Sequence, residues 1–275
     1  MKKPGRWIGG LVSIAVVIVV FIVPFVFVVL MASKTAPDAS NMEFTLPKQW
    51  ALLENIQTVL STRNGLVIRA FVNSTVLSVV SVALMVLLAA AVGYVSQRRR
   101  SRASGLVNFL VLAGLIVPPA VVPTIWVLQW LGLFKTLPGL ILIEVAYALP
   151  FCVLMFRAFV ATVPRELDEA AVIDGAGAVR VFLLIVMPLL KPVIVTVVVI
   201  QLVNVFNDFQ NPLYFLPGDQ GATVQLTLYN FMSQLVNQWN LVFADVLLIT
   251  ILPLIMYIFF NRQIVSGMTS GAIKG

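Results

Sequence analysis

Long apolar runs are the feature that most limits how this sequence can fold. Six segments, near residues 8–31, 71–96, 106–131, 138–160, 193–216 and 240–261, are each long and apolar enough to cross the bilayer as a helix. Crossing about 30 Å of hydrocarbon takes about 20 helical residues. Apolar residues make up 60% of the 275 residues and charged ones only 11%, which is far from the soluble range. The sequence therefore predicts an all-α membrane protein with six transmembrane helices in a single transmembrane domain, residues 1–275.

The first apolar run follows Lys2, Lys3 and Arg6, as the apolar core of a secretory signal would. It continues to Met31 without a small-residue cleavage pattern, so we interpret it as an uncleaved span.

Basic residues are unevenly distributed between the predicted connections, and this bias sets the orientation in the membrane. With a cytoplasmic N-terminus, thirteen of the eighteen Lys and Arg residues fall on the cytoplasmic side. The other five, Lys34, Lys48, Arg63, Arg69 and Lys135, fall outside. We therefore predict that both termini are cytoplasmic.

Several function classes are disfavoured by the residues that the sequence lacks. The sequence has no histidine, and its one cysteine, Cys152, lies in an apolar segment, so a His-based zinc site, a Ser-His-Asp triad and a disulfide are not available within the chain. Nucleic-acid binding is disfavoured because the basic residues are scattered without interleaved aromatics. A membrane enzyme would need a nucleophile–base pair or a metal constellation. An ion-gradient transporter would need inverted repeats and intramembrane ionisable pairs, whereas only Asp208 lies deep in a span.

Polar residues lie inside the fifth predicted span, where they are costly unless they face a cavity or a partner. Gln201, Asn204, Asp208 and Asn211 recur at steps of three, four and three, so we expect them on one helix face. Amides and carboxylates hydrogen-bond well to vicinal hydroxyls, which favours a substrate path for a sugar. Hydrogen bonding between packed helices is the alternative. Glu144 and Asp245 are lone acids near the outer ends of their spans, and the sequence assigns them no role.

The longest cytoplasmic connection, residues 164–188, has the chemistry of a short helix at its start. Pro164 fits the first turn, and Gly175 can adopt the left-handed conformation that ends a helix. Three acids complement the positive end of the helix dipole: Glu166, Asp168 and Glu169.

This short helix has two interpretations. Ala170 and Ala171 leave one face nearly flat, and Leu167 and Ile173 offer apolar contacts, which favours a docking element for another protein. The alternative is a linker that lies on the lipid headgroups. The acids disfavour the linker because anionic inner-leaflet lipids attract basic helices.

The spacing of this segment resembles a known motif. Glu169-Ala170-Ala171, three residues, Gly175, nine residues, Ile185, one residue and Met187-Pro188 are similar to the EAA motif of ABC importer permeases, EAA-x3-G-x9-I-x-L-P, in which only Met187 departs. "VPRELDEAAVIDGA", residues 163–176, resembles the carbohydrate uptake branch of the maltose and oligosaccharide type. "NDFQNPLYFL" and "NRQIVSGMTSGAIKG" extend the resemblance over nearly the whole chain, most closely to the smaller of the two permease subunits.

The resemblance implies a type I ABC importer permease fold and a division of labour. Such a permease forms a heterodimer with a second, different permease subunit in the inner membrane of a prokaryote. Two cytoplasmic ABC ATPase subunits bind ATP and Mg²⁺, and an extracytoplasmic sugar-binding protein delivers the solute. The chain itself would be a transport subunit and not an enzyme, and would bind no cofactor or metal. The implied solute is a disaccharide or oligosaccharide, with glycerol phosphate or another polar solute as the alternative.

The resemblance also implies roles for particular residues. ATPase coupling falls on Arg165, Glu166, Leu167, Asp168, Glu169, Ala170, Ala171, Ile173, Asp174 and Gly175, with Glu169 facing a basic residue of the ATPase. Asn207 falls at the family's "WND"-like position beside Asp208 and joins the substrate path, although Phe206 replaces the tryptophan that is common there. The cytoplasmic tail, residues 262–275, resembles tails that insert between the ATPase subunits, with a frayed terminus as the alternative.

Overall fold

The computed structural model describes residues 10, 13, 14, 16–99, 102–234 and 238–272, and all regular elements in these ranges are helices. Residues 8, 9, 11, 12 and 15 of the first predicted span and residues 273–275 of the predicted tail lie outside the described residues. The chain divides into two compact units, Met1–Ala70 with Val224–Leu254, and Phe71–Thr223 with Ile255–Gly275.

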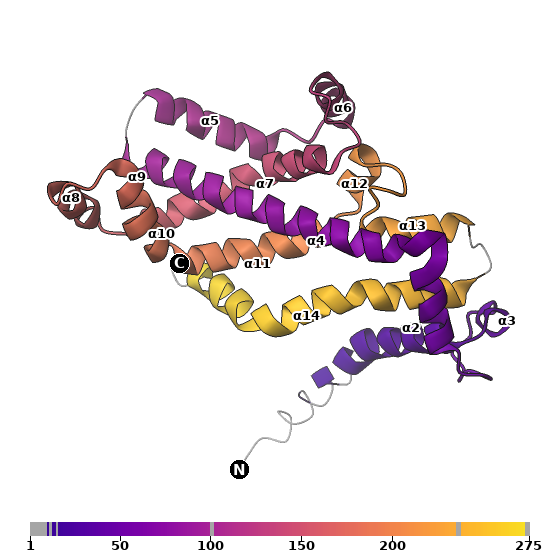
Figure 1. Ribbon diagram of the computed structural model, residues 1–275. Coiled ribbons are helices and arrows are strands. Elements are labelled where there is room, and N and C mark those ends of the chain that lie inside the picture. The colour runs from indigo at the N-terminus through magenta and orange to yellow at the C-terminus, as the bar shows by residue number, and fades with distance from the viewer. Residues whose placement is uncertain (1–9, 11–12, 15, 100–101, 235–237, 273–275) are drawn as a thin grey trace, which may run out of the picture. The chain divides into compact units, whose positions relative to one another are not determined.

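The first unit contains helices from both ends of the chain. They are η1 (Ile18–Ile22), α2 (Val23–Ser33), α3 (Ala36–Ala39), the start of α4 (Leu52–Arg98), α13 (Val224–Gln234) and the first part of α14 (Trp239–Ala272). Near its start α4 bends sharply (Figure 1), because Thr62 to Gly65 leave the helical conformation. Asn55 of α4 donates to the carbonyl oxygen of Ala32 at 2.8 Å, and Asn240 of α14 donates to Asn55 Oδ1 at 2.7 Å. These buried amides join α2, α4 and α14.

The second unit carries the remaining helices. They are the rest of α4, α5 (Arg102–Ile116), α6 (Val121–Trp130), α7 (Leu137–Val160), α8 (Glu166–Ile173), α9 (Ala178–Val181), η2 (Phe182–Val186), α10 (Met187–Leu189), α11 (Lys191–Asn207) and α12 (Gln210–Phe215). Helix α7 contacts α5, α11 and α12, so it is the central helix of this unit.

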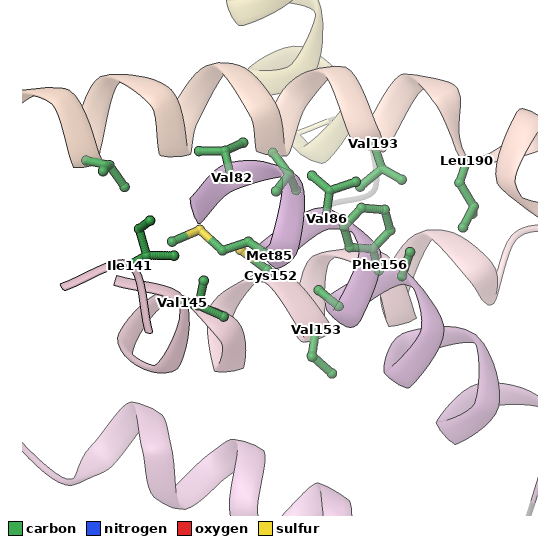
Figure 2. Packing of buried hydrophobic residues seen from close by; sticks show 14 of the residues in the cluster. Val82, Met85, Val86, Ile141, Val145, Cys152, Val153, Phe156, Leu190 and Val193 are labelled. Atoms are coloured by element: carbon green, nitrogen blue, oxygen red, sulfur yellow. The ribbon is translucent and has the colours of Figure 1, made fainter. Parts of the chain in front are cut away.

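Buried apolar side chains of α4, α7 and the start of α11 meet in one cluster (Figure 2). Met85 and Val86 of α4 pack there with Cys152 and Phe156 of α7. Gly93 brings the two backbones close together, since a Cβ at this position would lie 2.9 Å from Phe156 Cβ and 3.0 Å from the backbone nitrogen of Arg157. Small residues at such a crossing are typical of helix packing in membranes.

The helices differ from the predicted spans where prolines and capping residues interrupt them. The run 106–131 divides at Pro118 and Pro119 into α5 and α6, and the run 193–216 divides after Asn207 into α11 and α12. Proline lacks an N–H and disfavours helix in the residue before it.

By length and composition, the described part of the chain has two helices that could cross a membrane, α4 and α7, or three if Ala178–Leu189 and Lys191–Asn207, bent by 75°, form one span. The six crossings and the cytoplasmic termini therefore stay predictions.

Candidate functional site

A cavity of about 670 Å³ lies in the second unit between α7, α11 and the residues after α11. It is lined by Glu144, Tyr147, Ala148, Phe151, Ile200, Gln201, Val203, Asn204, Val205, Asn207, Asp208 and Asn211. The five residues assigned to the substrate path from the sequence, Gln201, Asn204, Asn207, Asp208 and Asn211, all line this one cavity. Their part in moving a solute stays a prediction.

The sequence spacing predicted that Gln201, Asn204, Asp208 and Asn211 share one helix face, but the structure shows no continuous helix through them. Helix α11 ends at Asn207, and Asp208 has an extended backbone with ψ 124°. Its Oδ1 accepts hydrogen bonds from the backbone N–H groups of Gln210 at 2.8 Å and Asn211 at 3.3 Å. Asp competes in this way with helix continuation, because its short carboxylate satisfies free N–H groups at the start of a new helix. Asp208 thus separates α11 from α12 and still faces the cavity.

Side-chain hydrogen bonds connect the walls of the cavity. Gln201 Nε2 lies 3.4 Å from Cys152 Sγ of α7, and Asn204 Nδ2 donates to Gln201 Oε1 at 3.3 Å. Asn211 Nδ2 donates to Glu144 Oε1 of α7 at 3.3 Å. Gln201 and Asn211 therefore both line the cavity and bond to α7, which is compatible with either interpretation of the polar residues in the fifth span.

Sequence reasoning missed the contribution of α7. Glu144 is only 6% exposed and lies in the cavity wall. The available signal was the spacing of Glu144, Tyr147, Ala148 and Phe151, which places all four on one helix face. Phe206 is 2% exposed and does not line the cavity, so its ring is not a platform for a solute there.

The predicted coupling helix is α8, Glu166–Ile173, with Arg165 and Asp174 as its flanking cap residues. Its first turn carries the acids Glu166, Asp168 and Glu169. Gly175 has φ +81°, which confirms the prediction of a left-handed glycine at the end of this helix.

The outer surface of α8 is mixed apolar and acidic. Leu167 is 42% exposed and Ile173 84% exposed, and Glu166, Glu169 and Ala170 are exposed beside them. Ala171, in contrast, is 6% exposed and packs into the hydrophobic cluster of the second unit. The prediction of a flat face made by both alanines is therefore wrong for Ala171, whose small size lets α8 pack against its own chain.

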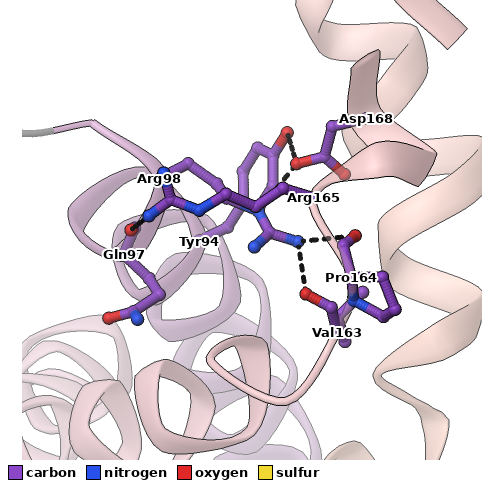
Figure 3. Close-up of polar contacts among 7 residues, drawn as sticks. All are labelled: Tyr94, Gln97, Arg98, Val163, Pro164, Arg165 and Asp168. Carbon is purple, nitrogen blue, oxygen red and sulfur yellow. Dashed lines mark hydrogen bonds and ion pairs between the residues drawn. The ribbon is translucent and has the colours of Figure 1, made fainter. Parts of the chain in front are cut away.

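Asp168 also faces its own chain and not the surroundings (Figure 3). Its Oδ2 accepts from Arg98 Nε at 2.7 Å and from the Tyr94 hydroxyl at 3.2 Å. The side chains of Arg98 and Asp168 are only 11% and 15% exposed. Both partners belong to the last turns of α4, so Asp168 positions α8 on that helix.

Two further contacts strengthen this attachment. Arg98 Nη2 donates to the carbonyl oxygens of Val163 at 3.0 Å and Pro164 at 3.4 Å, just before α8 begins (Figure 3). Arg165 Nη2 donates to the carbonyl oxygen of Gln97 at 3.3 Å. The start of α8 is therefore bonded to the end of α4 from both sides.

Comparison with known proteins assigns the chain to a protein family. The model of the binding-protein-dependent transport system inner membrane component matches residues 85–269, which include both the cavity and α8. The chain belongs to this family and is a permease subunit of an ABC transporter.

Individual permeases of this family are similar in sequence to the chain over most of its length. The multiple sugar-binding transport system permease protein MsmG of Streptococcus mutans is 32% identical over 93% of this chain and 93% of its own length. The diacetylchitobiose uptake system permease protein NgcG of Streptomyces coelicolor is 30% identical over 93% of this chain and 85% of its own. A chain from the crystal structure of a bacterial ABC transporter involved in the import of the acidic polysaccharide alginate superposes with a TM-score of 0.77 at 19% identity, covering 96% of this chain and 98% of that one. This likeness shows that the fold is that of a type I ABC importer permease.

Proposed function

We propose that this permease carries a disaccharide or oligosaccharide and that α8 couples its movement to ATP hydrolysis by partner subunits. The relatives MsmG and NgcG, whose names assign them to sugar and diacetylchitobiose uptake, support the solute class. The cavity supports it too, because its amides and carboxyls are the groups that bind vicinal hydroxyls.

The observation that carries the coupling proposal is the contrast between the two sides of α8. Leu167, Glu169 and Ile173 are exposed, whereas Asp168 and Ala171 are held against the chain's own helices. Helix α8 thus exposes an apolar and acidic surface, while Asp168 bonds it to α4. Such a surface suits a cleft that is lined by a basic residue in an ATPase subunit. Movement of that subunit would then be transmitted through Arg98 to α4.

The proposed assembly contains a second, different permease subunit, two ABC ATPase subunits and an extracytoplasmic binding protein, in the inner membrane of a prokaryote. Closure of the ATPase pair can shift the permease between inward-facing and outward-facing states only if it contacts the two states differently. The helical tail, which α14 extends to Ala272, is available to form a second contact with the ATPase subunits.

ATP hydrolysis by the complex in lipid, with its matching binding protein, tests the proposal directly. We expect one sugar from a panel of disaccharides and oligosaccharides to stimulate hydrolysis. Stimulation by none of them, together with stimulation by another polar solute, would remove the proposed solute class.

The variant Glu169→Lys tests α8. Reversing an exposed charge on the docking face should abolish sugar-stimulated hydrolysis while the permease pair still assembles. Glu54→Lys reverses another exposed acid, on the first turn of α4, and should retain stimulation. Normal stimulation in Glu169→Lys would show that α8 is not the coupling element.

A further inference from the structure

We propose that the cavity selects solutes without negative charge, so that it accepts neutral or amino sugars and rejects phosphorylated sugars, uronic acids and glycerol phosphate. The inference rests on the proposed function, since it takes this cavity as part of the solute path. It assigns the discrimination to Glu144 and Asp208.

The two carboxyl groups of the cavity lie close together. Asn211 bonds to both of them, through its side chain to Glu144 Oε1 and through its backbone N–H to Asp208 Oδ1, each at 3.3 Å. The negative charge that the cavity presents to a solute belongs to these two acids.

No cationic side chain lines the cavity to offset that charge. The residues that line the cavity are all described, and none of them is Lys or Arg. Glu144 is 6% exposed and Asp208 is partly buried, so water screens negative charge in this wall only weakly. An anionic solute would lose hydration on entering and would meet repulsion without a counter-charge, which is costly.

A neutral sugar meets suitable partners in the same cavity. Carboxyl oxygens accept hydrogen bonds from hydroxyl groups, and the exposed amide of Asn204 can both donate and accept. The rings of Tyr147 and Phe151 supply apolar wall for the C–H faces of a sugar. An ammonium group on an amino sugar would gain attraction to the carboxyl pair in addition.

A purely structural role for the two acids makes a different prediction. Glu144 would then serve only to hold Asn211, and Asp208 only to cap α12. The substitutions Glu144→Gln and Asp208→Asn separate the two possibilities, because both amides keep an oxygen acceptor and asparagine is also a good helix cap. They remove the charge and preserve the hydrogen bonds.

The test measures the charge preference of the cavity itself, in the assembled complex in lipid. Ala148→Cys, in a Cys152→Ser background, provides a thiol in the cavity wall. Its reaction rates with a cationic and an anionic methanethiosulfonate reagent are each divided by the rate of the same reagent with a free thiol in solution. We expect the cationic reagent to be favoured by about 10-fold or more. In the Glu144→Gln/Asp208→Asn variant the two normalised rates should become about equal, and with the control Glu54→Gln the preference should remain.

Equal rates in the parent, or an unchanged preference in the neutralised variant, would overturn the proposal. If Ala148→Cys prevents assembly, Val203→Cys on α11 provides a second position in the same wall. Sugar-stimulated ATP hydrolysis distinguishes failure of the charge-selection proposal from failure of the proposed function. If an anionic sugar stimulates hydrolysis as strongly as its neutral counterpart, only the charge selection is contradicted. If no sugar stimulates hydrolysis, the proposed function is contradicted, and the thiol reaction rates then report only the charge preference of the cavity.

Discussion

Arg98 binds three acceptors at the base of α8 with a single guanidinium group: the carboxylate of Asp168 and the carbonyl oxygens of Val163 and Pro164. Hydrogen bonds to a charged group contribute about 1.5–3 kcal/mol, and they are stronger where water is largely excluded. Arg98 is therefore a positioning residue for α8, although it does not belong to the segment that resembles the EAA motif.

Removing this attachment should uncouple ATP hydrolysis from transport. We expect Arg98→Ala to lower the number of solute molecules moved per ATP more than Asp168→Asn does, because Asp168→Asn leaves the two carbonyl contacts in place. The ratio of transport to hydrolysis in reconstituted vesicles measures this effect.

Asp168→Glu is the conservative control and should recover part of the coupling. Should Arg98→Ala and Asp168→Asn leave the ratio at the wild-type value, the bonds between α4 and α8 have no role in coupling.

Single residues also show where sequence reasoning stops. The acids of the first turn of α8 and the left-handed Gly175 follow from local rules of helix ends and could be predicted. The inward direction of Asp168 could not, because it depends on α4, which lies about 70 residues earlier in the chain. The burial of Ala171 could not either, because it depends on tertiary packing in the hydrophobic cluster. The sequence of α8 by itself assigns both residues to the surface that docks on the ATPase.

At the scale of elements, the sequence predicts the polar residues of the fifth span but not their arrangement in space. Steps of three and four predict one face only if the helix continues, and the hydrogen bonds of Asp208 to Gln210 and Asn211 end it. The sequence alone assigns no role to Glu144, because its partner Asn211 is on another helix. Pairing between helices is a property of packing and cannot be obtained from periodicity within one segment.

The crossing of α4 and α7 at Gly93 yields a prediction about helix packing. Gly93→Ala should destabilise the permease by about 1–3 kcal/mol, because the new Cβ has no space beside Phe156 and overpacking forces the helices apart. The loss should exceed the gain in helix propensity, which is about 1 kcal/mol. The temperature at which the purified complex loses assembly measures the net effect.

Gly105→Ala is the matched control, since a Cβ on this helical glycine of α5 would meet nothing within 4 Å. It should leave stability unchanged or raise it slightly. Phe156→Ala should not rescue Gly93→Ala, because the close contact is with the Cβ that alanine retains. A Gly93→Ala complex as stable as wild type would show that the two helices can separate at no cost.

At the scale of the whole molecule, the distribution of basic residues predicts which loops face the cytoplasm. Cys152 is 0% exposed, so single cysteines introduced elsewhere can be labelled against a low background. We expect a membrane-impermeant maleimide to label Lys48→Cys in cells whose outer layers have been removed and whose inner membrane is intact. Ile173→Cys on α8 should be labelled only after the membrane is made permeable.

Labelling of Ile173→Cys, and not of Lys48→Cys, from outside would invert the predicted orientation. It would also contradict the coupling role that we propose for α8, because the proposed ATPase partners are cytoplasmic. Labelling of both positions from the same side would instead change the number of crossings between them.

In the proposed function Asp208 performs two tasks, and this would limit how a lineage of such permeases can change its solute. Its Oδ1 satisfies two backbone N–H groups at the start of α12, while the same side chain faces the cavity. A mutation that alters solute choice here must also keep an acceptor for α12, which leaves few acceptable amino acids. Phe151 of α7 is 40% exposed, lines the same cavity and is free of that requirement. Evolution toward a new solute is therefore expected to proceed first through substitutions at positions such as Phe151, with Asp208 among the last to change.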